Sequence, residues 1–488
     1  MSNQTKICIP IVSADPVQRT EDIHAALEIT DCLELRLDRT GDIAPSELES
    51  LIGQIPQSIV TCRIAAEKGI DARKQRELLT AAAQLGSRYI DIEHDSPNLD
   101  VFLRNQRSSK IILSYHNFSA TPSARELDKL YARFQQKSPD LIKMVPRANS
   151  LNDCFRIFDL LADKDDLIAF CLGNSGMISR ILAPKYGSRI TYASLTPDRT
   201  SADGQITAAE MVDLYRVPQL HEKTQCLGVI GAQAHNSRSK LLHNPLFADY
   251  DLPYVFLPLQ VSPADLPNFM KNFRAYDFLG AAVTIPHKEA VTPFLDELDE
   301  NARNIGAVNT ILNVAGELVG FNTDVTGAIL ALKNEAEIEG TRALVMGAGG
   351  AARAIVYGLR QAGAEVTVVN RTHQRAAKLA AEFSVAAGDW QRLGQLVASH
   401  EIIINATSVG MAPNHKDKIL SDGCLQRDQL VMDIVYHPLR TTLIRQAEQA
   451  GCPTITGEKM LIYQALQQFL LWTGIEVGYP GMESYFYL

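Results

Sequence analysis

At 488 residues the chain is too long for a single hydrophobic core, so several compact units are expected. Its formal net charge of −9, with no long Lys/Arg run, argues against nucleic-acid binding. No apolar stretch reaches the roughly 18 residues that span a bilayer, and the first residues lack the pattern of a signal or transit peptide.

Eight short apolar segments recur at regular intervals in the first 200 residues, at 6–11, 32–37, 58–63, 89–93, 110–115, 141–145, 167–172 and 190–195. Most of the intervals carry an amphipathic helical pattern, as residues 75–83 do. This alternation predicts parallel βα units, and eight such units close a (β/α)8 TIM barrel. An open doubly wound sheet is the alternative that the pattern leaves.

Charged side chains gather at or near the carboxyl ends of these segments: Glu34, Arg36, Arg63, Asp91, Glu93, His116 and Lys143. Barrels of this kind place their chemistry there. Lys143 lies inside an apolar strand, where lost solvation is expected to lower its pKa and make it a nucleophile toward carbonyls. His116 could move protons for imine formation, and Arg36, Arg63 and Arg180 could bind a carboxylate. The pattern predicts imine chemistry on a small carboxylated ketone, unless Lys143 is a rim lysine that reaches solvent.

The first 220 residues resemble type I 3-dehydroquinate dehydratase. The resemblance rests on residues 34–38, Arg63 with Glu67, and segments 114–118, 142–145, 176–180 and 201–205, in the family's order. It implies Lys143 as the Schiff-base lysine and His116 as a general acid/base supported by Glu67. It also implies substrate contacts from Glu34, Arg36, Arg63, Arg180, Ser201 and Gln205. Segment 170–172 lacks the methionines that the family often has, so the apolar lining differs.

A glycine-rich turn follows the apolar segment 343–346 and precedes a helical stretch at 354–359. Glycines let the backbone approach a pyrophosphate, and the helix N-terminus offers free N–H groups. The next apolar segment, 365–369, ends in Asn370, Arg371 and Thr372 where an acid would bind a free ribose hydroxyl. An arginine there suits a 2′-phosphate, which favours NADP over NAD. The alternative is a helix-capping turn with an exposed arginine.

Three apolar segments upstream lead into small polar residues, within 283–289, 306–310 and 320–324. Asn, Thr and Asp side chains supply the donors and acceptors that hold a polyhydroxylated ring. Lys288 with Asp324 could pass a proton to and from a substrate alcohol during hydride transfer. The sequence therefore predicts an alcohol or ketone site next to the nucleotide fold.

Residues 225–488 resemble shikimate dehydrogenase, on these motifs together with 237–239, 405–411, 433–436 and 460–464. The resemblance implies Lys288 and Asp324 for catalysis. It implies shikimate contacts from Ser237, Ser239, Thr284, Asn309, Tyr436 and Gln464. It implies NADP contacts from Gly347, Ala348, Gly349, Gly350, Ala351, Asn370, Arg371, Thr372, Thr407 and Met411.

Two places depart from the shikimate dehydrogenase pattern. Segment 233–240 lacks the prolines usual around the two serines, and Ala282 stands where an Asn before Val-Thr is common. Because both serines are present, we expect an altered loop shape or substrate tuning and a retained site.

These patterns predict an α/β chain in three parts: a barrel at 1–220, a substrate lobe at 225–330 with C-terminal helices 456–488 returning to it, and a Rossmann NADP lobe at 331–455. The resemblances imply a bifunctional shikimate-pathway enzyme that serves aromatic amino acid synthesis. Its lyase half would dehydrate 3-dehydroquinate through an imine, and its oxidoreductase half would reduce 3-dehydroshikimate to shikimate with NADPH. The alternatives are a quinate-directed second half, or one half that is a non-catalytic module.

Small-molecule substrates are the expected partners, with neither nucleic acid nor membrane, for a monomer or homodimer. Eight cysteines are scattered without a Cys-x-x-Cys pair, which favours free thiols in a reducing compartment and a cytoplasmic location. No His, Asp, Glu or Cys set has metal-ligand spacing, so no metal is expected.

Overall fold

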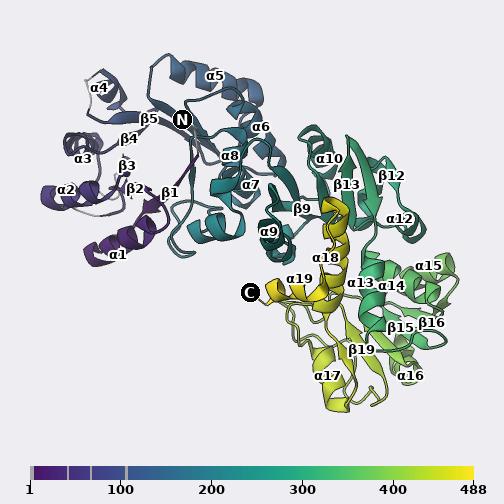
Figure 1. Cartoon of the computed structure of the whole chain (residues 1–488). Helices are drawn as coiled ribbons and strands as arrows, with labels where there is room; N and C mark the ends of the chain where they lie inside the picture. The colour runs from purple at the N-terminus through teal and green to yellow at the C-terminus, as the bar shows by residue number, and fades with distance from the viewer. Residues whose placement is uncertain (1–4, 41–42, 66–68, 105–107, 488) are drawn as a thin grey trace. The chain divides into compact units, whose positions relative to one another are not determined.

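The computed structural model describes residues 5–40, 43–65, 69–104 and 108–487, which divide into two compact units (Figure 1). The first unit is Met1–Gln225 and the second is Cys226–Leu488. Among the described residues, no helix combines the length and apolar character needed to cross a membrane. All eight cysteines are free thiols, and most are buried.

The first unit is built on one eight-stranded sheet. Its strands are β1 (Lys6–Ile11), β2 (Cys32–Arg36), β3 (Gln57–Thr61), β4 (Tyr89–Glu93), β5 (Lys110–Asn117), β6 (Leu141–Pro146), β7 (Leu167–Ala169) and β8 (Ile190–Tyr192). Neighbours from β1 to β7 pair in parallel in chain order, and β8 pairs in parallel with β1. Because β7 also contacts β8, the sheet closes on itself. The barrel predicted from the sequence is confirmed.

Helices lie outside these strands (Figure 1). They are α1 (Pro16–Leu27), α2 (Pro45–Gln54), α3 (Ala72–Gln84), α4 (Leu99–Arg104), α5 (Ala124–Gln135), α6 (Asn152–Leu161), α7 (Met177–Ile181) and α8 (Ala183–Tyr186). Side chains fix several of their starts, since Asp15 accepts from Gln18 N and Ser123 forms a capping box with Glu126. Such caps satisfy N–H groups that have no partner within the helix. Because the eight strands pair in parallel, their carboxyl ends lie at one mouth of the barrel.

The second unit begins with a mixed sheet in the order β10-β9-β11-β13-β14-β12. Its strands are β9 (Gln225–Gly231), β10 (Tyr254–Gln260), β11 (Gly280–Val283), β12 (Glu297–Leu298), β13 (Thr310–Val314) and β14 (Glu317–Phe321). The helices along this stretch are α9 (Ser239–Asp249), α10 (Leu266–Ala275), α11 (His287–Ala290) and α12 (Glu300–Ile305).

The end of the chain returns to this sheet through α18 (Gly457–Thr473) and α19 (Tyr479–Phe486), drawn in yellow in Figure 1. Phe469 and Trp472 of α18 pack in one buried cluster with Phe247 of α9 and Phe256 of β10. Helix α18 also packs against α13 (Asp324–Lys333), which leads into the next lobe. This lobe of the second unit is therefore assembled from two distant stretches of sequence.

The remaining sheet is parallel, in the order β17-β16-β15-β18-β19-β20. Its strands are β15 (Arg342–Met346), β16 (Glu365–Val369), β17 (Ala386–Ala387), β18 (Ile402–Asn405), β19 (Leu430–Asp433) and β20 (Thr454–Ile455). Its helices are α14 (Gly350–Gln361), α15 (His373–Phe383), α16 (Leu393–Ala398) and α17 (Thr442–Ala450). Numbered from β15, this is the order 3-2-1-4-5-6 of dinucleotide-binding sheets. The predicted Rossmann lobe is confirmed.

Candidate active sites

Lys143 lies inside the barrel between two carboxylates. Its Nζ is 2.9 Å from Asp91 Oδ2 and 3.7 Å from Glu34 Oε1, and it lies 4.2 Å from the ring centre of Tyr192. These four residues come from the alternate strands β2, β4, β6 and β8, which is how one layer of a barrel interior is filled. Tyr192 is a member of this layer that the sequence did not single out.

The electrostatics of Lys143 differ from the expectation. Burial lowers its pKa, but Asp91 and Glu34 outweigh burial and raise the pKa above its ordinary value. The prediction of a lowered pKa for Lys143 is therefore wrong, because it considered burial and left out the two facing carboxylates. The lysine of the isolated protein is an ammonium paired with Asp91, and it must lose a proton before it can attack a carbonyl.

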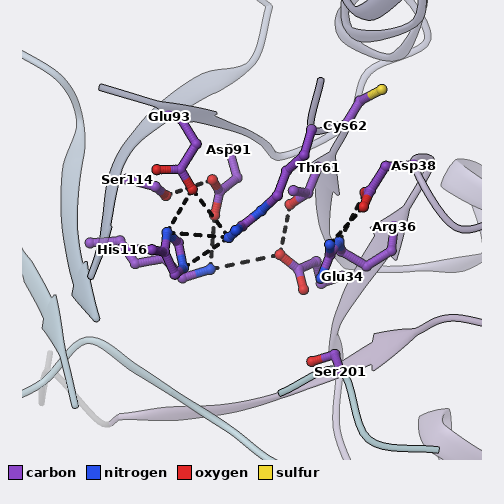
Figure 2. Close-up of polar contacts among 12 residues, drawn as sticks. Glu34, Arg36, Asp38, Thr61, Cys62, Asp91, Glu93, Ser114, His116 and Ser201 are labelled. Atoms are coloured by element: carbon purple, nitrogen blue, oxygen red, sulfur yellow. Dashed lines mark hydrogen bonds and ion pairs between the residues drawn. The ribbon is translucent and has the colours of Figure 1, made fainter. Parts of the chain in front are cut away.

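His116 of β5 lies beside Glu93, as Figure 2 shows, and it also contacts Arg63. Its Nδ1 is 2.6 Å from Glu93 Oε1, and its Nε2 is 2.9 Å from Arg63 Nη2. Burial, with Arg63 next, holds the pKa of His116 well below its usual range, so the imidazole is neutral and can accept a proton. Burial raises the pKa of Glu93 to about 7.

Glu67, expected to support His116, lies outside the described residues. Glu93 is the carboxylate that the structure places next to the imidazole. The sequence held a signal for it, since Glu93 ends β4 two residues after Asp91 and so faces the same side of the strand.

The three arginines differ in what they can still bind. Arg36 is paired with Asp38 through two hydrogen bonds of 3.0 and 2.7 Å, as Figure 2 shows. Arg63 contacts Glu93 at 3.1 Å. Arg180 is 1% exposed and stacks on Phe170, yet its Nε and Nη2 have no hydrogen-bond partner within the described chain. Burial lowers its pKa to about 10. A buried guanidinium with open donors is a binding group for an anion.

Ser201 and Gln205 bind each other in the loop after β8. Gln205 Oε1 accepts from Ser201 N at 2.8 Å, and Gln205 Nε2 donates to Ser201 Oγ at 3.0 Å. Figure 2 shows Ser201 on the side of Glu34 and Arg36. Arg147, directly after β6, donates to Phe118 O at 2.9 Å and pairs with Asp203, so it joins this loop to the one that follows His116.

The second unit contains a cluster around Lys288 of α11. Lys288 pairs with Asp324 Oδ2, and Asp324 Oδ1 accepts from Asn309 Nδ2 at 2.8 Å. Gln464 Oε1 lies 3.4 Å from the same Asn309 Nδ2. Asn309, Asp324 and Gln464 are buried. Four residues predicted from the sequence are thus brought together, although they lie as far apart as 288 and 464 in the chain.

The other residues predicted to contact substrate lie around Arg238 and β11. Ser237 Oγ donates to Ser239 Oγ at 3.1 Å, and Arg238 between them stacks on Phe486. Desolvation raises the pKa of the partly buried Tyr436, and the charge of Arg238 opposes this rise. Thr284 directly follows β11. The changed 233–240 segment is thereby tied to the C-terminal helix. Ala282 packs in the apolar cluster with Phe469 and Trp472, so this departure falls in the core of the lobe.

The glycine turn has the backbone geometry that a dinucleotide needs. Gly347 has φ +131°, and a Cβ there would lie 2.8 Å from Ala406 O. Helix α14 begins at Gly350, and its N-cap Gly349 offers no side chain, so the first N–H groups of the helix are open. A Cβ on Gly350 would lie 3.0 Å from Lys288 Cδ, which places the turn directly against the Lys288 cluster. The residues present fit a bound pyrophosphate.

Two loops flank this turn. Arg371 is exposed at the end of β16, and Asn370 Nδ2 donates to Thr372 O at 3.0 Å. Thr407 Oγ1 donates to Asn405 Oδ1 at 2.7 Å, and exposed Met411 follows in the same loop. Asp433 accepts from Asn405 at 3.0 Å and from Thr441 at 2.7 Å, and burial raises its pKa to about 6. Asp433 belongs to the motif 433–436, but the sequence assigned it no role; its bond to Asn405 links it to the Thr407 loop.

Three family models match this chain. The model for type I 3-dehydroquinase matches residues 7–222. The model for the shikimate dehydrogenase substrate binding domain matches residues 229–311, and that for shikimate / quinate 5-dehydrogenase matches residues 329–436.

The chain is similar over most of its length to a bifunctional 3-dehydroquinate dehydratase/shikimate dehydrogenase, chloroplastic, from Arabidopsis thaliana. The two are 34% identical over 97% of this chain and 83% of the relative. A crystal structure of a shikimate dehydrogenase in complex with NADP+ matches with a TM-score of 0.52 and 36% identity, over 55% of this chain and 96% of that one. A quinate dehydrogenase from Corynebacterium glutamicum in complex with NAD matches with a TM-score of 0.51 and 31% identity, over 54% and 99%.

Proposed function

The chain belongs to the bifunctional 3-dehydroquinate dehydratase/shikimate dehydrogenase family, and from this premise we propose which residues carry each reaction. The first half is a lyase that converts 3-dehydroquinate to 3-dehydroshikimate. The second half is an NADP-dependent oxidoreductase that reduces 3-dehydroshikimate to shikimate. Both reactions act on small molecules of the shikimate pathway.

Dehydration is assigned to Lys143 and His116. The Lys143 amine, once its proton has passed to Asp91 or Glu34, attacks the substrate carbonyl and forms an imine with loss of water. Neutral His116 then removes the proton beside the imine, and a proton is returned to the departing hydroxyl group. Arg180 binds the substrate carboxylate with its open donors. Water then cleaves the imine and releases the product. The observation that carries this assignment is Lys143 buried among two carboxylates near a neutral histidine.

Borohydride tests the imine. Incubation with 3-dehydroquinate and borohydride is expected to attach the reduced product covalently to Lys143, read as a mass increase on its peptide. The Lys143→Met variant should acquire no mass, whereas Lys288→Met should be labelled as fully as the unchanged protein. Labelling of another lysine would refute the assignment.

Reduction is assigned to the Lys288 cluster. When bound at the Gly347–Gly350 turn, NADPH supplies the hydride for the substrate carbonyl carbon. Lys288 provides the proton to the carbonyl oxygen, and Asp324 holds its ammonium in place. Asn309 and Gln464 bind the ring hydroxyl groups, together with Ser237, Ser239, Thr284 and Tyr436. Arg371 and its neighbours Asn370 and Thr372 bind the 2′-phosphate, while Thr407 and Met411 flank the cofactor.

Replacement of Lys288 tests this half separately. We expect Lys288→Met to lose NADPH-dependent reduction by at least about a hundredfold, as for a removed general acid. Dehydration in the same protein should be unchanged. Loss of both activities would contradict independent sites, and the Lys143→Met and Lys288→Met pair also tests whether either half is a non-catalytic module.

A quinate-directed second half is the other candidate. The matching family model covers both shikimate and quinate 5-dehydrogenases, and a quinate dehydrogenase is among the similar structures. The ratio of kcat/KM for shikimate and quinate oxidation separates the two.

A monomer or homodimer in the cytoplasm is also proposed, although the Arabidopsis relative is named chloroplastic. Sedimentation and cell fractionation test these two points.

A further inference from the structure

A line of buried polar groups runs from helix α18 to the Lys288 cluster. Gln468 of α18 donates from Nε2 to Thr310 Oγ1 at 3.0 Å and to Asn309 O at 3.4 Å. Thr310 Oγ1 donates to Asn309 Oδ1 at 2.8 Å. Asn309 Nδ2 in turn donates to Oδ1 of Asp324, and Oδ2 of the same carboxylate pairs with Lys288. Gln468 and Thr310 are at most 1% exposed, so water does not compete for these bonds.

Each bond in this line has only one possible direction. The backbone oxygen of Asn309 can only accept, so the Gln468 amide must present its NH2 group to it. The same NH2 group donates to the Thr310 oxygen, which leaves the Thr310 hydrogen for Asn309 Oδ1. Asn309 Oδ1 also accepts from Thr323 N at 2.7 Å. Asn309 must therefore point its own NH2 group at Asp324.

The surroundings of Gln468 make this arrangement costly to disturb. His243, which interacts with the Gln468 side chain, is fully buried and stacks on Phe256 with 4.7 Å between ring centres. Burial lowers the pKa of His243 to about 3, so no charge lies behind the amide at neutral pH. Asn309 O also accepts from Val283 N at 2.6 Å, so the bond that matters most from Gln468 is the one to Thr310 Oγ1, and its loss would leave that buried oxygen without the amide donor.

We propose that Gln468 and Thr310 are positioning residues of the reductase half. Together with the Thr323 N–H group, they fix the orientation of Asn309, so that its NH2 group holds one oxygen of Asp324 and the other oxygen remains for Lys288. This inference rests on the proposed roles of Lys288 and Asp324. Helix α18 would thus contribute to catalysis through Gln468 as well as through the contact of Gln464 with Asn309.

Kinetics of shikimate oxidation in the full chain test this proposal. We expect Gln468→Met, which keeps about the same volume but removes the donor, to lower kcat/KM for shikimate about tenfold, because Thr310 Oγ1 then lacks the donor that directs its hydrogen to Asn309. Thr310→Val should cause a similar loss, whereas Thr310→Ser, which keeps the hydroxyl, should stay within about twofold of the unchanged protein. The double variant should lose no more than either single one, because both residues act through the same bond to Asn309.

Three controls come with the chain itself. Gln467, the neighbouring position on α18, offers the matched Gln467→Met variant, which should retain full activity. The KM for NADP and the dehydratase activity should be unchanged in every variant. The Thr310→Ser and Thr310→Val pair decides the matter if Gln468→Met does not fold.

The outcomes separate this inference from the proposed function. Full activity of Gln468→Met alongside inactive Lys288→Met overturns the positioning role alone. Equal losses in Thr310→Ser and Thr310→Val, or additive losses in the double variant, also overturn it, because they indicate general damage to packing. An active Lys288→Met variant overturns the proposed function instead, whatever Gln468→Met does.

Discussion

The charge on Lys143 depends on its immediate neighbours in the barrel. Burial disfavours the ammonium form of Lys143, whereas Asp91 and Glu34 stabilise it. The two carboxylates have the larger effect, so the pKa of Lys143 is raised. Lys143 is therefore held as an ion pair in the barrel interior, and Asp91 and Glu34 are two bases that can accept its proton. Ser114 donates to Asp91 Oδ1 and Thr61 donates to Glu34 Oε1, so both carboxylates are held in place.

Asp91→Asn is expected to lower the pKa of Lys143, because it removes the largest contribution that opposes burial. The asparagine oxygen can still accept from Ser114, so the strand contact is kept. With a lower pKa the free amine exists at lower pH, and the pH dependence of borohydride labelling should shift downward by about one pH unit or more. Mass spectrometry of the Lys143 peptide across pH measures this shift. An unchanged or upward-shifted profile would show that Asp91 does not set the charge of Lys143.

At the scale of elements, the return of α18 explains what the sequence could and could not predict. The motif at 460–464 indicated Gln464, because a resemblance attached it to a site. Gln468 and Trp472 carry no such motif, and their roles follow from contacts with β13, about 160 residues earlier in the chain. In the first half, Tyr192 was missed for the same reason, and Glu93 was placed at a strand end without being paired with His116, because strand pairing brings these residues to Lys143 and His116.

Strand positions were predictable and some strand ends were not. Buried parallel strands read as apolar runs, so all eight barrel strands could be found from hydrophobicity alone. The run predicted at 167–172 nevertheless ends as a strand at Ala169. Phe170, Cys171 and Leu172 stay buried after the regular ladder stops, so an apolar pattern reports burial and not pairing.

Gly280 of β11 provides a prediction at this scale, because α18 packs directly on its backbone. A Cβ there would overlap Trp472 Nε1 and lie 2.6 Å from Ile311 O, which accepts the Trp472 hydrogen bond at 3.0 Å. We expect Gly280→Ala to lower the free energy of unfolding of the second unit by about 1–3 kcal/mol. Heating should then abolish reductase activity at a lower temperature than dehydratase activity, measured in one sample.

Gly53 of α2 is the matched control, since a Cβ there meets nothing within 4 Å. Gly53→Ala should leave both inactivation temperatures unchanged or raise that of the dehydratase, by about 0.5–1 kcal/mol of helix stability. Equal inactivation temperatures for both activities in Gly280→Ala would contradict a local effect of the Trp472 contact.

At the scale of the whole molecule, the described residues of each candidate site come from one unit. The carboxylates, histidine and arginines around Lys143 all lie in Met1–Gln225, and the partners of Lys288 all lie in Cys226–Leu488. The regular spacing of the first half and the glycine turn of the second made this two-part organisation readable from the sequence. Dehydroshikimate, the product of the first reaction, is the substrate of the second.

Mixing two inactive variants tests that independence. Lys143→Met keeps only reduction and Lys288→Met keeps only dehydration, so neither alone should convert 3-dehydroquinate to shikimate. An equimolar mixture with NADPH should do so, because dehydroshikimate released by one molecule can be bound by the other. NADPH absorbance should fall after a lag, while the intermediate accumulates to its steady level, and more Lys143→Met should shorten that lag. Dehydroshikimate added directly to Lys143→Met should be reduced without a lag. A mixture that forms no shikimate would mean that the two sites do not work independently, because each needs an intact partner site on its own chain.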